Sequence, residues 1–397
     1  MAALRHLTII LIVAIGLSAC NSMGPVGRTI KKLVREDISN AIDPTALDEE
    51  FENKLAVTEV WSKRIGKGAQ ELYLKLTPAS IGQFLFVADR YGQLAATDLK
   101  SGEVVWEIND KNVHYSSGPG GGEGIVLIGT GDARVIARDA LTGKLRWVAK
   151  VSSEVLAAPQ VGKGVAVIRT GDGNLFGLNI ETGSEMWNYD RTVPSLTLRG
   201  NAPPVIDDDI VLAGFDNGRL VALNLLTGKP LWDNPLAIPS GRSDLERMVD
   251  VDAEPAVFGT TVFVASFHGG VSAMSLIDGR IEWTREISSY AGVDVGPDLV
   301  FVTDEDGSIW ALKQEDGTSV WKQDGLKHRF VTAPIFHRGY IVVSDFEGYV
   351  HWLDATSGEP VFRDQIDKQR IIAPALSTDE FLLAHSSSGR LVAMRAP

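Results

Sequence analysis

Two acidic clusters, Asp207–Asp209 and Asp304–Gly307, have side chains that could bind a metal ion. Calcium needs about six to eight oxygen ligands that converge on one point. Both clusters stand where the sequence predicts β-turns, so we interpret them as solvated turn residues. Ser116 is not part of a nucleophile-elbow motif, and the run Gly118–Gly122 has no following Lys-Ser or Lys-Thr for phosphate binding. The histidines show no metal-binding spacing either, so the sequence predicts no catalytic, metal or cofactor site.

The single cysteine, Cys20, stands at the end of a pattern typical of a secretory signal. Arg5 precedes an apolar run from Leu7 to Leu17, which is shorter than the roughly twenty residues of a membrane span. The four residues from Leu17 to Cys20 resemble the lipobox of bacterial lipoproteins. This resemblance implies that residues 1–19 are a signal peptide that is removed and that Cys20 is acylated. A single cysteine forms no internal disulfide, so packing alone must stabilise the fold.

The segment that follows Cys20 is expected to be a lipidated tether, spanning residues 20–54. By the sorting rule of such lipoproteins, Asn21 after the cysteine implies transfer to the outer membrane. Residues 30–42 could also form an amphipathic helix within the tether. The chain has 38 basic and 51 acidic residues, and its net charge of −13 becomes −14 when Arg5 is removed with the signal. Nucleic acid is therefore not an expected partner, because phosphate binding requires clustered Lys and Arg.

A repeated pattern fills the rest of the chain. The turn motif Asp/Asn-x-x-Thr/Ser-Gly followed by an outer-strand Trp is clearest at residues 98–106, 139–147, 179–187 and 224–232. Weaker copies end at the aromatic residues Trp283, Trp321 and Phe362. Two alternating apolar strands precede each turn, and Ala-Pro or Glu-Pro often marks a further, innermost strand. Four antiparallel strands over about forty residues are typical of a propeller blade.

The last repeat lacks its outer strand, and the start of the repeated region can supply it. Residues 57–61 have the outer-strand pattern and end at Trp61, whereas the chain ends at Pro397 without a matching strand. Trp61 raises the number of outer-strand aromatics to eight. The sequence therefore predicts an all-β domain over residues 55–397. We expect an eight-bladed β-propeller of four-stranded antiparallel blades, closed by an N-terminal outer strand that completes the last blade.

The repeat resembles those of two families with different functions. The Asp-x-x-Thr-Gly-x-x-x-Trp motif is similar to that of quinoprotein dehydrogenases, eight-bladed propellers that hold pyrroloquinoline quinone (PQQ) and calcium. That family uses a vicinal cysteine pair beside the quinone, and this chain has only Cys20. The lipobox, the length of 397 residues and the eight repeats together resemble instead the BamB family of the β-barrel assembly machinery.

The second resemblance implies a non-enzymatic lipoprotein on the periplasmic side of the outer membrane. Such a protein would bind BamA and assist nascent outer-membrane proteins to fold and insert, without a cofactor. Two alternatives stay open at this point. One is a PQQ- and calcium-dependent dehydrogenase, and the other is a periplasmic ligand-binding or sensor propeller.

Two long connections are expected to lie side by side on one face of the propeller. The spacing of the outer-strand aromatics is enlarged between Trp187 and Trp283, and the excess falls after Trp187 and after Trp232. Both connections run from an outer strand to the next inner strand, so they emerge on the same face. Loops on a rigid scaffold are where binding residues usually lie.

These connections contain the predicted partner-binding residues. The resemblance implies that a Leu-x-Leu-Arg segment and an Asp-x-Asp segment form the surface that binds BamA, which corresponds here to Leu196, Leu198, Arg199, Asp250 and Asp252. In an extended segment, Leu196 and Leu198 would point the same way. Alternatively, the leucines cover the top of the propeller and Arg199 pairs with Asp250 or Asp252 within the chain.

Overall fold

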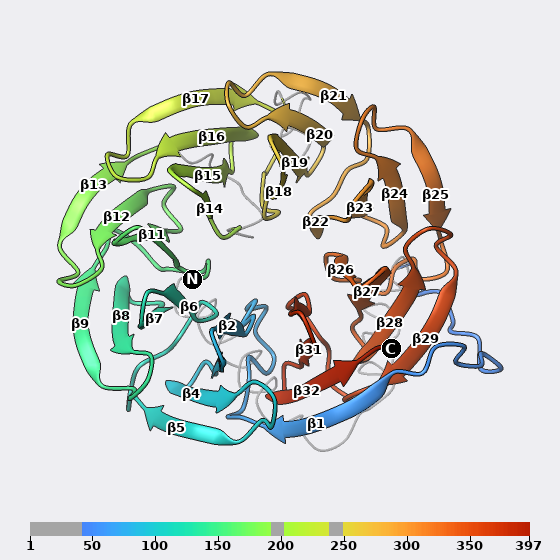
Figure 1. The fold of residues 1–397 in the computed structure, drawn as a ribbon, viewed down its shortest axis with the longest axis horizontal. Helices are drawn as coiled ribbons and strands as arrows, with labels where there is room; N and C mark the ends of the chain where they lie inside the picture. Colours follow the sequence, from blue (N-terminus) through green and yellow to red (C-terminus); the bar gives the residue numbers. More distant parts are fainter. Residues whose placement is uncertain (1–41, 192–201, 238–248) are drawn as a thin grey trace, which may run out of the picture. The chain divides into compact units, whose positions relative to one another are not determined.

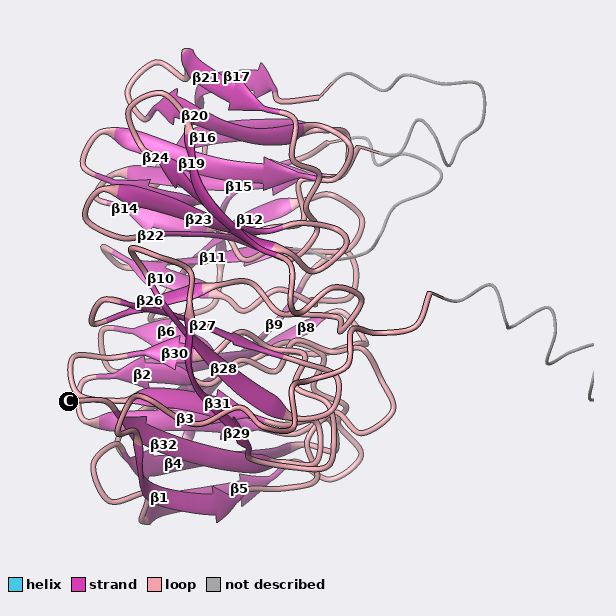
Figure 2. Ribbon diagram, turned by 90° about the vertical axis from the view of Figure 1, so that its right-hand side faces the viewer, coloured by secondary structure: helices cyan, strands magenta, loops and turns pink. Residues whose placement is uncertain are grey.

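Eight four-stranded antiparallel sheets form the blades of the protein, and they are arranged around a central axis (Figure 1). The computed structural model describes residues 42–191, 202–237 and 249–397. Figure 2 shows the disc edge-on, with the connections between strands gathered at its two faces. The predicted all-β, eight-bladed propeller is therefore confirmed.

The first four blades follow one another along the chain, and each runs from its innermost to its outermost strand. Their strands are β2 (Ala79–Ile81), β3 (Phe84–Ala88), β4 (Gln93–Asp98), β5 (Val104–Asn109); β6 (Gly120–Gly122), β7 (Ile125–Gly129), β8 (Arg134–Asp139), β9 (Leu145–Lys150); β10 (Gln160–Gly162), β11 (Val165–Arg169), β12 (Leu175–Asn179), β13 (Glu185–Tyr189); and β14 (Val205–Asp207), β15 (Ile210–Phe215), β16 (Arg219–Asn224), β17 (Pro230–Pro235).

Blades five to seven repeat this order, and blade eight takes its outer strand from the start of the propeller. The strands are β18 (Ala256–Phe258), β19 (Thr261–Ser266), β20 (Gly270–Ser275), β21 (Ile281–Arg285); β22 (Gly292–Val295), β23 (Leu299–Thr303), β24 (Ile309–Lys313), β25 (Ser319–Gln323); β26 (Ile335–His337), β27 (Tyr340–Ser344), β28 (Tyr349–Asp354), β29 (Pro360–Gln365); and β30 (Leu376–Ser377), β31 (Leu382–His385), β32 (Arg390–Arg395), β1 (Thr58–Arg64).

The ring is closed by β1, which pairs antiparallel with β32 over the register from Thr58↔Arg395 to Arg64↔Arg390. This confirms that the region around Trp61 completes the last blade. Trp61 is 9% exposed and its indole N–H donates to the carbonyl of Leu99 in blade one at 3.1 Å. Closure leaves no open sheet face at the junction between the first and last blades.

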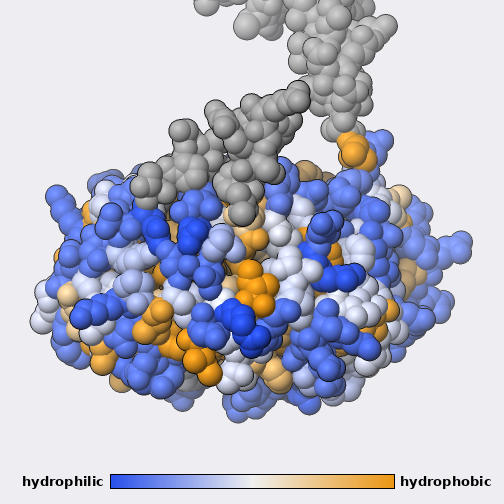
Figure 3. All heavy atoms as spheres, turned by 90° about the horizontal axis from the view of Figure 1, so that it is seen from above, coloured by the Kyte–Doolittle hydropathy of each residue, from blue (hydrophilic) through white to orange (hydrophobic). Residues whose placement is uncertain are grey.

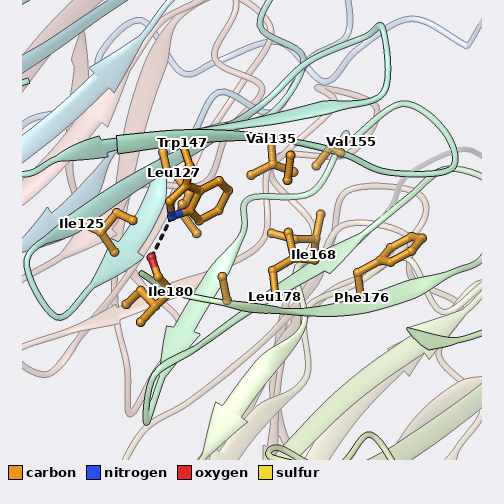
Figure 4. Packing of buried hydrophobic residues seen from close by; sticks show 12 residues of the cluster. Ile125, Leu127, Val135, Trp147, Val155, Ile168, Phe176, Leu178 and Ile180 are labelled. Carbon is orange, nitrogen blue, oxygen red and sulfur yellow. Dashed lines mark hydrogen bonds between the residues drawn. The ribbon is translucent and has the colours of Figure 1, made fainter. Parts of the chain in front are cut away.

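Each repeat motif joins one blade to the next through its tryptophan. In blade three, the side-chain oxygen of Asn179 accepts hydrogen bonds from the backbone N–H and hydroxyl of Thr182, both at 3.1 Å. The indole of Trp147 in blade two donates to the carbonyl of Ile180 at 2.7 Å (Figure 4). Gly183 has φ 71°, and a Cβ there would lie 2.6 Å from the Trp147 ring. Only glycine therefore combines this backbone conformation with this close approach.

The core lies between successive blades rather than at the centre of the disc. The cluster between blades two and three, drawn in Figure 4, includes Leu127, Val135, Ile168 and Leu178, each 2% exposed or less. Each such side chain contributes about 1.5–3 kcal/mol through apolar burial. Comparable clusters occur at the other blade junctions, so the hydrophobic stabilisation is spread around the ring.

Part of the segment expected to be a tether packs on the propeller. The compact unit that contains the blades begins at Thr45, before the boundary at residue 55 that the repeat predicts. The backbone N–H groups of Lys54 and Leu55 donate to the carbonyl of Val361 in β29 at 2.8 and 3.0 Å. Leu55 and Val57 also pack against the apolar cluster of blades seven and eight. The packing of these partly buried side chains explains why the compact unit begins before residue 55.

Several predicted features lie outside the described residues. They include the signal peptide, Cys20 and nearly all of the possible helix over residues 30–42. Among the residues that the structure describes, no helix is long and apolar enough to span a membrane.

Candidate functional site

The predicted partner-binding residues come from the connections that lead into blades four and five. Leu196, Leu198 and Arg199 fall within residues 192–201, outside the described residues. Asp250 and Asp252 are described, and they follow β17 and precede β18. The structure therefore shows the base of the predicted site, at the ends of blades three to five.

Asp250 and Asp252 are buried, with exposed fractions of 1% and 3%. The carbonyl of Asp250 accepts the N–H of Phe267 at 2.9 Å, and Val249 forms a parallel bridge with Asn217. Between the two aspartates, Val251 is fully buried in the apolar cluster of blades four and five. The resemblance implied that these carboxylates are part of a contact surface or pair with Arg199, and the structure shows that both are buried.

Val251 also explains a glycine in the neighbouring strand. A Cβ at Gly214 of β15 would lie 2.4 Å from Cγ1 of Val251 and 2.6 Å from its carbonyl oxygen. Gly214 therefore allows the connection to approach the end of β15 closely. The connection that holds Asp250 and Asp252 is fixed by backbone hydrogen bonds and by side-chain packing.

A buried ion pair lies beside these aspartates. The guanidinium of Arg169, at the end of β11, is 2.6 Å from the Asp216 carboxylate, and the two side chains are 1% and 5% exposed. Arg169 also donates to the carbonyl of Ala202 at 3.3 Å, where the connection from blade three enters blade four. Burial raises the pKa of Asp216, the charge of Arg169 lowers it, and the charge of Asp252 raises it further. Arg169, Asp216 and Asp252 thus form one electrostatic cluster at the ends of blades three to five.

Sequence reasoning missed this ion pair. Arg169 ends an otherwise apolar strand of five residues, and Asp216 directly follows the corresponding strand of the next blade. A charged residue at the end of a buried strand is the available signal, because charges are seldom fully buried without a partner. The repeat aligns these two strand ends in neighbouring blades.

A cavity of about 830 Å³ occupies the centre of the ring. The inner strands and the connections leading into them line it, and its ionisable residues include Lys75, Glu254 and Asp294. Burial within the ring, reinforced by the charge of Asp294, raises the pKa of Glu254 to about 7, although its side chain is exposed to the cavity. Burial likewise raises the pKa of Asp294 to about 6 and lowers that of Lys75.

Asp294, one of the acidic residues that line the cavity, has structural contacts. In the described part of the chain, no three His, Cys, Asp or Glu side chains are grouped as metal ligands. Asp294 accepts hydrogen bonds from the backbone N–H groups of Phe336 and Val295 at 2.6 and 2.8 Å. This carboxylate therefore links blades six and seven.

The two acidic clusters singled out in the sequence have structural contacts. Asp304 accepts the backbone N–H groups of Asp306 and Ser308 at 3.1 and 2.8 Å, and the indole N–H of Trp310 at 2.9 Å. In the other cluster, Lys163 of the preceding blade bridges Asp208 and Asp209 at the surface. Both clusters are turns, as predicted.

Comparison with known proteins identifies relatives over most of the chain. Residues 92–323 match the family model described as outer membrane protein assembly factor BamB. The BamB proteins of Xanthomonas campestris and Kangiella koreensis are 36% and 37% identical, over 87% and 90% of this chain and 87% and 92% of theirs. BamB of Escherichia coli is 32% identical over 85% of this chain and 88% of its own length.

Solved structures agree with these sequence relatives. The crystal structure of BamB from Moraxella catarrhalis superposes with a TM-score of 0.79 at 28% identity, covering 86% of this chain and 100% of that one. A quinohemoprotein alcohol dehydrogenase from Comamonas testosteroni reaches a TM-score of 0.68 at 13% identity, covering 88% of this chain and 78% of that one. The second match shows a shared fold alone.

Proposed function

The chain belongs to the BamB family, and on that premise we propose that it acts as an outer-membrane protein assembly factor that binds BamA. Its function would be to hold BamA and nascent outer-membrane proteins in position while the latter fold and insert. Relatives named as assembly factors support this proposal over most of the chain.

The observation that carries the proposal is the fixed base that the described residues form at the ends of blades three to five. Arg169 and Asp216 join the ends of blades three and four, and Val251 anchors the following connection between blades four and five. Loops that emerge from such a base can present a contact surface with little loss of entropy on binding. We propose that Leu196, Leu198 and Arg199 contact BamA directly. Asp250 and Asp252, being buried, would hold the connections in place.

Membrane attachment is the second part of the proposal. Removal of residues 1–19 and acylation of Cys20 would anchor the protein in the outer membrane, with the propeller in the periplasm. More than one acyl chain is needed for stable anchoring, since a single chain binds membranes only marginally. The part of residues 20–54 that precedes Thr45 would then be the tether, and the remainder packs on blade seven.

Purification from membranes tests this function without a prior choice of partner. The full-length protein with a C-terminal affinity tag is extracted in mild detergent, and its partners are identified by mass spectrometry. A Cys20→Ala variant serves as the control for membrane attachment. We expect BamA to be the most enriched partner of the wild-type protein. Recovery of the wild-type protein without BamA, at a detergent concentration that preserves the assembly complex, would contradict the proposal.

A further inference from the structure

The chain uses the outer edge of blade seven to hold an extended segment of its own (blue beside β29 in Figure 1). The carbonyl of Val361 accepts the N–H groups of Lys54 and Leu55. The Asn53 side chain accepts the backbone N–H of Arg363 at 2.8 Å and donates to its carbonyl at 3.3 Å. An outer strand of this propeller can therefore bind an added, extended polypeptide through its backbone.

At each blade junction we compare two surface positions. The first is the residue before the outer-strand aromatic, and the second, on the next blade, is the residue after the carbonyl that accepts the indole N–H. The pairs that belong to Trp187 of blade three and Trp232 of blade four form a set that we call the rim strip. Its four residues are 46%, 48%, 50% and 73% exposed, in the order Met186, Leu226, Leu231 and Ile277.

The two pairs of the rim strip belong to neighbouring blades. Trp187 donates to the carbonyl of Leu225, next to Leu226, and Trp232 donates to that of Leu276, next to Ile277. Figure 3 views the rim over β17 and β21 and shows apolar patches on an otherwise hydrophilic surface. Exposed apolar patches of this kind mark interaction surfaces.

Charged residues occupy the same two positions on the blades that flank the rim strip. In blade two they are Arg146 and Glu181, which form an ion pair at 3.5 Å. In blade five they are Glu282 and Glu315. Blade one has an apolar pair, Val105 and Leu141. The equivalent pair of blade eight is Val60 and the charged Lys100, and both positions of blade two are charged. Among the described blades, only three and four place two apolar pairs next to each other.

The outer strand of blade three, β13, has a backbone edge equivalent to that of β29 in blade seven, which residues 53–55 contact. Asn188 directly follows Trp187 and pairs with Phe176, as Arg363 directly follows Phe362 and pairs with His351. By this register, Asn188 turns its backbone N–H and carbonyl outward, as Arg363 does. The edge of β13 thus combines an outward backbone N–H and carbonyl with exposed apolar side chains. This arrangement permits strand addition.

We propose that the edge of β13 and the rim strip bind an extended segment with alternating apolar side chains, as an unfolded strand of an outer-membrane protein provides. The segment adds a fifth strand to blade three, and its apolar side chains cover Met186 and Leu226 and continue toward Leu231. This inference rests on the proposed function, since it names the surface for client strands. It concerns the rim, which is separate from the connections proposed to bind BamA.

The test uses a short fluorescein-labelled peptide of alternating valine and threonine with lysines at both ends. Its binding to the full-length protein, purified in mild detergent, is measured by fluorescence anisotropy. Asn188→Pro removes the outward N–H, and proline is tolerated at an edge position of this kind. Met186→Asp places a charge on the rim strip without changing the backbone. Val148→Pro is the matched control, because Val148 occupies the same register in charged blade two, opposite Ile136.

We expect the wild-type protein and Val148→Pro to bind the peptide equally. Asn188→Pro and Met186→Asp should each bind it at least about tenfold more weakly, which corresponds to roughly 1.4 kcal/mol. Absence of wild-type binding, or equal effects of the two proline variants, would overturn the inference. BamA copurification with the same variants is measured in parallel. If the wild-type protein retains BamA but does not bind the peptide, the rim inference fails and the proposed function stands.

Discussion

Removal of the Arg169 charge should destabilise the protein strongly, because the ion pair with Asp216 is almost fully buried. The variant Arg169→Met leaves the Asp216 carboxylate without its cation and beside the negative charge of Asp252. Breaking a buried pair in this way costs about 3–5 kcal/mol. The exposed pair Arg146–Asp139, with side chains 34% and 25% exposed, is the matched comparison. Arg146→Met should cost only about 0.2–1 kcal/mol.

A double-mutant cycle separates the ion pair from the packing of its side chains. Urea unfolding followed by tryptophan fluorescence gives the free energies of the wild-type protein, Arg169→Met, Asp216→Asn and the double variant. Since the double variant has no uncompensated charge at this pair, its loss should be smaller than the sum of the single losses by about 2 kcal/mol or more. This lies within the range of about 0.5–3 kcal/mol seen for contacting residues. A coupling below about 0.5 kcal/mol, or equal losses for Arg169→Met and Arg146→Met, would refute the reasoning.

Three further predictions concern anchoring, closure and pH. Cys20→Ala should abolish labelling by radioactive palmitate, and labelling that persists would contradict the lipid anchor. Deletion of residues 21–44 should leave the melting temperature nearly unchanged. Deletion through Trp61 should abolish cooperative unfolding in calorimetry, because β1 and its contact with blade one are lost. Equal melting of both truncations would mean that the ring closes in another way. Because the pKa of Glu254 is raised from 4.5 to about 7, ionisation disfavours the folded state increasingly between these pH values. Glu254→Gln should therefore stabilise the protein at pH 8 by about 1 kcal/mol, a value reduced for the exposure of the side chain to the cavity water, and should have little effect at pH 4. Identical pH dependence of the melting temperatures of variant and wild type would exclude this role.

The features predicted from sequence are those with a local, repeated signal. The turn that begins at Asn179 and the tryptophan at Trp147 define one blade junction, and the same spacing recurs around the ring. Counting these motifs gave the number of blades, and the unmatched strand at Trp61 gave the closure. Such signals require only residues that are close in the chain.

The remaining features depend on contacts between residues that are distant in the chain. Lys54 meets Val361 across the outer edge of blade seven, and no motif in either segment indicates this pairing. Asp250 and Asp252 are buried because Val251, which lies between them, packs between two blades. The sequence of the loop does not reveal this packing. The resemblance alone could not indicate that both carboxylates are buried.

The central claim, that the face with the long connections binds BamA, is tested most directly by a variant in which Leu196, Leu198 and Arg199 are all replaced by alanine. The control is Leu141→Ala, which removes a 64% exposed leucine from the rim. Full burial of each leucine against BamA would contribute about 1.5–3 kcal/mol, so the triple variant should lose BamA in copurification. Its melting temperature should remain within a few degrees of the wild type, and Leu141→Ala should retain BamA. Retention of BamA by the folded triple variant would contradict the account and place the interface elsewhere on the propeller.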